Sequence, residues 1–179
     1  MSNRRECSRK HRGGSLRLPG YDYTQGGAYA VTVRAWGAAP LFGDVADGRM
    51  RHSAYGEIAQ ECCEEIPLHF PHAQVDTCVV MPNHLHVIFI VHERDQLRGR
   101  GKDETGERFG KPVAGSIPTI IRSLKSAVTR RINEMRGTPG EKVWQRGYYD
   151  HVIRDARELN RYRRYVQQNP LRWSLSQDD

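Results

Sequence analysis

The 179-residue sequence lacks the features that mark membrane, secreted and disulfide-rich proteins. No apolar run approaches the roughly 20 residues that a transmembrane helix needs. The stretch up to Gly20 is polar and arginine-rich, without the apolar segment of a secretory signal. The cysteines Cys7, Cys62, Cys63 and Cys78 form no Cys-x-x-Cys pair, which is a poor start for a disulfide framework. We therefore expect a reduced, cytoplasmic protein without a membrane span.

Apolar residues are scarce, and basic residues outnumber acidic ones. The hydrophobic fraction of 37% is enough for one modest core, and the mean hydropathy of −0.73 indicates much solvated surface. The sequence has 28 Lys and Arg against 21 Asp and Glu, a net charge of +7. An anionic partner is therefore expected, with nucleic acid as the first choice and a membrane surface as the second.

The distribution of charge and glycine divides the chain into segments. Residues 1–19 form a basic arm, either a solubilising tail or an arm that contacts phosphates. Residues 94–116 are rich in Gly, Arg, Lys and Glu and are expected to form a flexible internal loop. We expect one domain over 20–173, which includes that loop, and a short tail over 174–179.

Hydrophobic periodicity predicts both strands and helices. Alternating residues predict strands over 28–36, 41–45, 75–81 and 85–91. Helical spacing predicts helices over 53–66, 118–135 and 156–168. The last helix should end at Pro170, because the residue before a proline avoids helical geometry. This order predicts an α+β fold, with an antiparallel sheet and helices against one face.

The most informative local motif is His84-Leu85-His86 at the start of a predicted strand. Side chains at i and i+2 of a strand share a face, so both imidazoles can converge on one ion while Leu85 faces the core. Neutral imidazole binds Mn²⁺ and Zn²⁺ and is tolerated around Mg²⁺ when phosphate oxygens complete the shell. Two surface histidines at a strand end remain the alternative. A third ligand must come from elsewhere.

Several segments resemble one known family. Residues 80–87, Val-Met-Pro-Asn-His-Leu-His-Val, are similar to the HUH motif (His, bulky apolar residue, His) of the single-tyrosine HUH transposases. Residues 20–23, 123–128, 143–151 and 164–170 resemble the REP-associated tyrosine transposases within that group. The similarity is co-linear from about residue 20 to 173.

The resemblance implies a ferredoxin-like antiparallel sheet with a central HUH strand and a C-terminal tyrosine helix. It also implies a transposase and endonuclease that cleaves single-stranded DNA hairpins at repeat sequences, with Mg²⁺ or Mn²⁺ on His84 and His86. Tyr165 matches the nucleophile. Asn169, one turn later, matches the third metal ligand, although a helix-cap role is equally open. Tyr162 shares an apolar stripe with Leu159 and Val166 and is expected to face the core.

Tyrosine chemistry would suit cleavage followed by rejoining. Forming a phenolate at pH 7 costs on the order of 4 kcal/mol, so a metal on the phosphate or a cation such as Arg161 or Arg164 would have to assist. A 5′-phosphotyrosine retains the energy of the phosphodiester, so another strand's hydroxyl can reseal it without ATP.

Basic and aromatic residues in the second half are candidates for DNA contact, although a solvated helix face is the alternative for each. The predicted phosphate contacts are Arg122, Lys125, Arg130, Arg131 and Arg146, and the predicted stacking residues are Trp144 and Tyr148. His151 is a spare candidate for metal or phosphate. The expected partner is a DNA hairpin, which implies association with the nucleoid.

Alternative functions and assemblies stay open. A repeat-DNA-binding protein without cleavage and an HUH replication initiator or relaxase are the alternative functions, and the short chain disfavours the latter. Both a monomer and a homodimer are compatible with the sequence.

Overall fold

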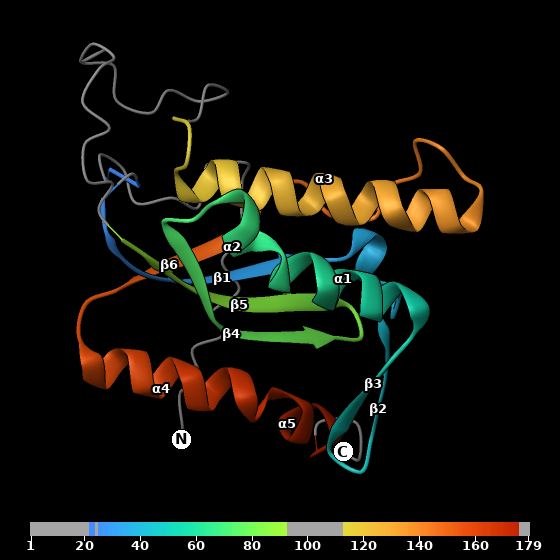
Figure 1. The fold of residues 1–179 in the computed structure, drawn as a ribbon. Helices are drawn as coiled ribbons and strands as arrows, with labels where there is room; N and C mark the ends of the chain where they lie inside the picture. The colour runs from blue at the N-terminus through green and yellow to red at the C-terminus, as the bar shows by residue number, and fades with distance from the viewer. Residues whose placement is uncertain (1–21, 24, 93–112, 176–179) are drawn as a thin grey trace, which may run out of the picture.

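The computed structural model describes residues 22, 23, 25–92 and 113–175 (Figure 1). The predicted basic arm, almost all of the internal loop and most of the tail lie outside the described residues. The central feature is a four-stranded antiparallel sheet in the order β4-β5-β1-β6. Its strands are β1 (Gly27–Arg34), β4 (Ala73–Met81), β5 (His84–Val91) and β6 (Tyr149–Ile153).

Helices cover both faces of this sheet. Helix α1 (Ala54–Glu64) connects β1 to β4, and helix α3 (Ile117–Arg136) connects β5 to β6, which together make the ferredoxin-like arrangement. Figure 1 shows these two helices on one face and α4 (Ala156–Gln167) and α5 (Asn169–Leu175) on the other. The α+β class and the central position of the strand that carries His84 and His86 are confirmed. The expectation that helices lie against one face only was wrong.

Smaller elements lie at both ends of β5: a 3-10 turn and a hairpin near its start, and a short helix near its end. A 3-10 turn, η1 (Trp36–Ala38), follows β1. Strands β2 (Gly43–Ala46) and β3 (Arg49–His52) form a separate hairpin, and α2 (Ile66–His69) precedes β4. Gly56 allows α1 to approach the chain before this hairpin, since a Cβ there would lie 2.1 Å from the Phe42 carbonyl oxygen.

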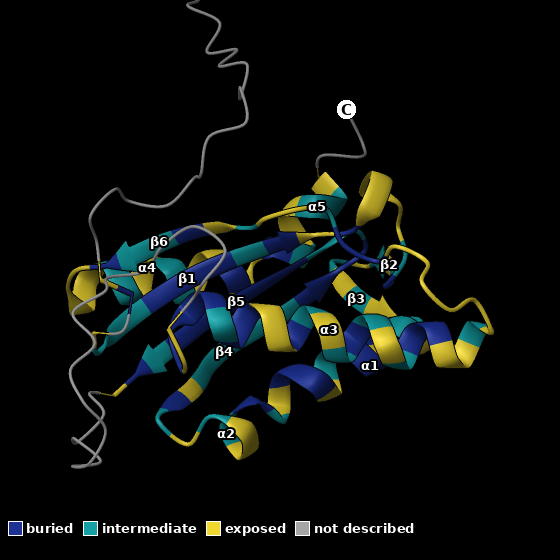
Figure 2. Cartoon of the chain, turned by 90° about the horizontal axis from the view of Figure 1, so that it is seen from above, coloured by how far each residue is buried: buried dark blue, intermediate teal, exposed yellow. Residues whose placement is uncertain are grey.

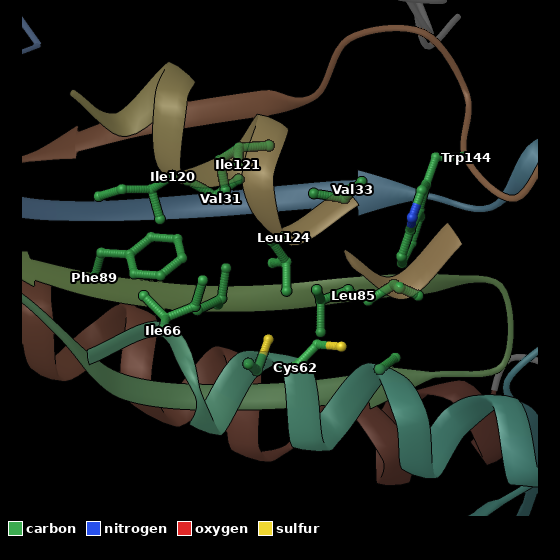
Figure 3. Close-up of a cluster of buried hydrophobic side chains, with 14 of the residues drawn as sticks. Val31, Val33, Cys62, Ile66, Leu85, Phe89, Ile120, Ile121, Leu124 and Trp144 are labelled. Carbon is green, nitrogen blue, oxygen red and sulfur yellow. The ribbon is translucent and has the colours of Figure 1, made fainter. Parts of the chain in front are cut away.

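The main hydrophobic core lies between the sheet and helices α1 and α3. Figure 2 shows α3 lying across the sheet with buried and exposed residues alternating along it, and its buried residues include Ile120, Leu124 and Val128. Alternate residues of β1 and β5, such as Val33 and Leu85, meet Leu124 of α3 in this core (Figure 3). Each fully buried aliphatic side chain contributes about 1.5–3 kcal/mol. This face of the sheet therefore supplies most of the stability.

A smaller core fixes α4 to the opposite face. It joins Val166 of α4 to Ala30, Ile88 and Ile153 of the sheet. Tyr162 packs against this cluster, in agreement with its predicted position. The tyrosine helix is thus docked on the sheet of its own chain.

An ion pair adds a directional contact between α4 and β4. The Arg163 guanidinium donates to both carboxylate oxygens of Asp76, at 2.8 and 2.5 Å. Asp76 lies at an irregularity in the β4–β5 register. The hydrogen bond from Arg163 lowers the pKa of Asp76, so the carboxylate is charged at neutral pH.

Two parts of the fold differ from the sequence-based expectation. Strand β6 was not predicted, because its five residues lie in a segment without sustained alternation. The chain also stays helical beyond Pro170: α4 ends at Gln167, and α5 begins at Asn169 with the proline in its first turn. Proline is tolerated there, because the first helical N–H groups need no intrahelical partner.

Candidate active site

His84 and His86 of β5 point to the sheet face that α4 and α5 cover. Their Nε2 atoms lie 3.0 Å apart. The two imidazoles meet edge to face, with ring centroids 4.6 Å apart. The two-residue period of the strand thus places both rings at one point, as the motif predicts.

Each imidazole is held through its other ring nitrogen. His84 Nδ1 lies 2.7 Å from Asn83 Oδ1, and the Asn83 amide donates through Nδ2 to the Ala38 carbonyl at 3.3 Å. Because the amide oxygen can only accept, His84 Nδ1 carries the proton and its Nε2 presents a lone pair. His86 Nδ1 lies 2.8 Å from the Thr32 hydroxyl, which can accept or donate. Both Nε2 atoms can therefore act as metal ligands.

Burial keeps both histidines neutral. Desolvation, with the positive charge of Arg34, lowers the pKa of His84 to about 4. Desolvation, with His84 and Arg34, lowers the pKa of His86 to about 3. Neutral imidazole is the form that binds a metal, so the ligating form is fully populated at pH 7.

The C-terminal helices bring two further predicted residues to this point. The Tyr165 ring meets the His86 ring edge to face with centroids 5.6 Å apart, and its side chain is 40% exposed. Asn169 is buried, and its Nδ2 lies 3.2 Å from His86 Nε2. Gln168, rather than Asn169, occupies the cap position of α4. A rotation of the Asn169 amide by half a turn would direct its oxygen toward the histidines.

These donors suit a hard divalent cation with open positions. Two imidazole nitrogens and one amide oxygen would hold Mg²⁺ or Mn²⁺ loosely and leave sites for phosphate oxygens. Within the described residues, no group of three or more His, Cys, Asp or Glu side chains gathers in a way that could hold a metal. Any ion at this point therefore depends on His84, His86 and the neutral Asn169.

An open cleft of about 1580 Å³ runs past the histidines and Tyr165. Its walls come from β1, β5, the segment before β6, and helices α4 and α5. The arginines that line it are Arg34, Arg146, Arg161, Arg164 and Arg172. No Asp or Glu lines the cleft within the part of the chain that the structure describes. This lining favours a polyanion.

Only some of the predicted DNA-contacting residues line this cleft. Arg146 and Tyr148 line it. Arg122, Arg130 and Arg131 lie on α3, on the other side of the sheet (Figure 1), and do not line it. Arg131 instead pairs with Glu65 at 2.5 Å and with Glu61 at 3.7 Å.

Lys125 and Trp144, which were also predicted to contact DNA, make contacts within the protein instead. Lys125 Nζ donates to the carbonyls of Gln145 and Gly147, at 2.8 and 2.9 Å, and so holds the segment that lines the cleft. Burial lowers the pKa of Lys125. Trp144 is 7% exposed and packs on the Phe42 ring in the main core (Figure 3), so it presents no free face to a base.

His151, the spare candidate, contacts α4 rather than the histidine pair. Its Nε2 lies 3.0 Å from Glu158 Oε1, and its ring stacks on Tyr162. His151 does not line the cleft.

The site residues that the sequence reasoning missed include Thr32, Arg34, Asn83, Arg172 and Trp173, whose ring centroid lies 5.9 Å from that of His84. Arg34 and Thr32 lie directly across from His84 and His86 in the β1–β5 register. Their proximity to the histidines depends on strand pairing, which no local pattern reveals. Asn83 could have been found from the sequence, because it directly precedes His84. The guanidinium of Arg172 lies 5.4 Å from the centre of the Tyr165 ring.

Comparisons with known proteins found two relatives by sequence. No protein-family model matches the sequence. An uncharacterised protein of Haemophilus influenzae is 33% identical over 174 residues, which is 93% of each chain. A second protein of that organism, provisionally named a REP-associated tyrosine transposase, is 26% identical over 152 residues, covering 84% of this chain and 74% of its own.

One solved structure supports the same fold. It is a REP-associated tyrosine transposase bound to a REP hairpin, and the match has a TM-score of 0.60 over 87% of this chain and 73% of that chain. The sequence identity in this match is 16%, so it establishes the fold. Within the described residues, no helix combines the length and apolarity that crossing a bilayer requires.

Proposed function

We propose that this chain, a member of the REP-associated tyrosine transposase family, cleaves and rejoins single-stranded DNA at hairpin-forming repeats, with Tyr165 as nucleophile. The observation that carries this proposal is the position of Tyr165, whose ring contacts that of His86 in a cleft lined by arginines. A protein that only bound DNA would need neither a tyrosine at that point nor two histidines held with their Nε2 atoms together.

The arginines would bind and orient the strand. Arg34 and Arg146 lie on the sheet side of the cleft, and Arg164 and Arg172 on the side of α4 and α5. A strand between them would have cations on both sides of its phosphates. Positioning of the scissile phosphate against the nucleophile and electrostatic stabilisation are the largest contributions to phosphoryl transfer.

Tyr165 would then attack phosphorus. Its phenolic oxygen forms the new P–O bond, the bond to the 3′ oxygen breaks, the phenol proton passes to water, and the leaving 3′ oxygen takes a proton from water. The products are a 5′-phosphotyrosine and a free 3′-hydroxyl. The reverse attack, by the 3′-hydroxyl of another strand, releases Tyr165 and rejoins the DNA.

His84, His86 and Asn169 would hold Mg²⁺ or Mn²⁺ beside this tyrosine. An ion bound there would polarise the scissile phosphate and stabilise its developing negative charge. Asn83 and Thr32 would keep the two Nε2 atoms aimed at the ion, as hydrogen-bond partners of ligating histidines generally do. Metal ligation in this chain would therefore depend on hydrogen bonds that reach β1 and η1.

One chain would supply the whole site. The small core around Val166 and the Arg163–Asp76 pair hold α4 on the sheet that carries the histidines. We therefore propose that a monomer is sufficient for cleavage.

A denaturing gel tests the proposed function. Wild-type protein with a labelled single strand that forms a repeat hairpin should give a covalent protein–DNA band with Mg²⁺ or Mn²⁺ and none with a chelator. Tyr165→Phe should still shift the hairpin on a native gel but form no covalent band. Tyr162→Phe, one turn earlier on the same helix, is the matched control and should retain the band.

The other outcomes decide between alternatives. A covalent band that persists in Tyr165→Phe would move the nucleophile to another tyrosine. A shift without any covalent band in the wild type would favour the DNA-binding protein that does not cleave.

A further inference from the structure

The exposed turn after β1 carries one large side chain. Residues 36–40 are all exposed, and Trp36 is 49% exposed between small neighbours. A Cβ atom added at Gly37 would meet no atom within 4 Å, so the space beside this neighbouring residue is open. Tryptophan is highly buried on average in folded proteins. A half-exposed indole on a polar, basic surface is therefore available for contact with a ligand.

This turn adjoins the cleft and is held in place. Along the chain, Trp36 lies between Arg34 and Ala38, which both line the cleft, while Trp36 itself is outside the lining. The backbone N–H of Trp36 donates to the Val143 carbonyl at 2.8 Å, and the backbone N–H of Ala35 donates to the Asn83 carbonyl at 2.9 Å. Both Gly37, at φ +65°, and Ala38, at φ +55°, have left-handed backbone. A non-glycine residue in that region is uncommon and is maintained only where the surroundings enforce it.

The turn is also linked to the histidine pair. The Ala38 carbonyl accepts a hydrogen bond from the Asn83 side-chain amide, and Asn83 Oδ1 in turn accepts a hydrogen bond from His84 Nδ1. The backbone that presents Trp36 is thus in hydrogen-bond contact with the residue that orients His84. The backbone at residue 36 therefore has a defined position relative to the proposed cleavage centre.

A cation accompanies the indole. Lys142 Nζ lies 4.2 Å from the centre of the Trp36 ring. The nearby cleft is lined by five arginines and, among the residues that the structure describes, by no Asp or Glu. An aromatic ring paired with a cation beside such a cleft is a combination that binds single-stranded nucleic acid. Bases stack on aromatic rings regardless of their identity, and lysine or arginine contacts the adjacent phosphates.

We propose that Trp36 and Lys142 form a stacking platform that holds an unpaired base of the DNA strand at the His84 end of the cleft. This inference rests on the proposed function, since it assigns to that substrate a single-stranded segment next to the hairpin. It assigns to Trp36 the stacking role that the sequence analysis gave to Trp144, which is buried.

Two fluorescent probes test the platform: a DNA hairpin with an oligothymidine single-stranded flank, and the same hairpin without the flank. Trp36→Ala should weaken binding to the flanked hairpin at least about fivefold, because stacking of one base contributes 1–3 kcal/mol. It should leave binding to the blunt hairpin unchanged. Trp36→Phe should recover most of the affinity. Met135→Ala, which truncates an exposed apolar residue on α3 outside the cleft, is the matched control and should bind both probes like the wild type.

Lys142→Ala gives an independent measure. It should reduce the slope of log Kd against log salt concentration by about 0.7 on the flanked probe, the value for one phosphate contact on a single strand. The platform is refuted if Trp36→Ala binds the flanked probe as tightly as the wild type, or loses equal affinity for both probes.

The covalent-band assay keeps this test separate from the proposed function. If the wild type binds the flanked hairpin but forms no covalent band with metal, the proposed cleavage fails, while the Trp36→Ala comparison still decides the platform. If the band forms and Trp36→Ala binds normally, only the platform fails.

Discussion

Breaking the Arg163–Asp76 ion pair should both destabilise the protein and impair the positioning of Tyr165. The pair links α4, two residues before Tyr165, to β4 of the central sheet. The perturbation is a double-mutant cycle with Asp76→Asn, Arg163→Met and the double variant. Such a cycle isolates the interaction of the two side chains from the other effects of each substitution.

The burial of the two partners sets the expected magnitude. The Arg163 side chain is 37% exposed and that of Asp76 is 14% exposed, so the pair lies between a solvent-exposed and a buried ion pair. Exposed pairs contribute about 0–1 kcal/mol, whereas removal of one partner of a buried pair costs about 3–5 kcal/mol. A bidentate guanidinium–carboxylate contact favours a value above the exposed range. We expect a coupling free energy of about 1–2 kcal/mol at pH 7.

Urea denaturation measures this coupling, and the exposed pair Asp47–Arg51 supplies the control. Its side chains are 90% and 65% exposed, so a cycle with Asp47→Asn and Arg51→Met should give less than about 0.5 kcal/mol. The Tm of each Asp76 or Arg163 single variant should fall by about 2–8 °C, given a shift of about 2–4 °C per kcal/mol for a chain of this length. Formation of the covalent band should slow in the same variants.

The pH dependence gives a second readout. The pKa of Asp76 is lowered in the folded state, so the pair stabilises the protein above the ordinary carboxyl pKa of about 3.9. That stabilisation is lost as the pH falls through the lower, folded-state pKa. A coupling energy at pH 7 no larger than that of the Asp47–Arg51 control would refute the view that this pair fixes α4.

Two further predictions concern the histidine pair and the assembly. The folded-state pKa values of about 4 for His84 and about 3 for His86 lie below the unfolded value of about 6.5, so the unfolded chain binds more protons between these pH values. The free energy of unfolding, measured in urea, should therefore fall as the pH drops from 6.5 toward 4. A variant with both histidines changed to Gln should lose much of this pH dependence. Because a single chain supplies the whole proposed site, a mixture of Tyr165→Phe and His86→Ala should form no covalent band; restored cleavage in the mixture would instead show that the tyrosine helix is exchanged between subunits.

Local patterns were sufficient for the parts of the site that lie on single elements. The shared face of His84 and His86 follows from the two-residue period of a strand, which is a property of the backbone alone. The placement of Tyr162 against the sheet follows from helical periodicity in the same way. The assignment of Tyr165 and Asn169 to the histidine pair came from the family resemblance, and the structure brings both side chains to His86.

Contacts between separate strands and helices could not be predicted from such local patterns. Arg34 and Thr32 join the site because β1 pairs with β5 in one register, and that register depends on the whole sheet. Arg122 and Arg130 are basic helix residues like those of α4, yet α3 crosses over the opposite face of the sheet. Sequence could not assign a face to either helix, because each presents only an apolar stripe.

The difference between Trp144 and Trp36 shows the same division. By itself, the sequence determined that the chain forms an α+β domain, that two histidines share a strand face, and that a basic protein has an anionic partner. Only the tertiary structure decided that Trp144 is enclosed against Phe42, whereas Trp36 is exposed beside the cleft. The physical reason is that burial depends on which distant segments pack against a residue, and that packing is established only when the whole sheet and its helices assemble.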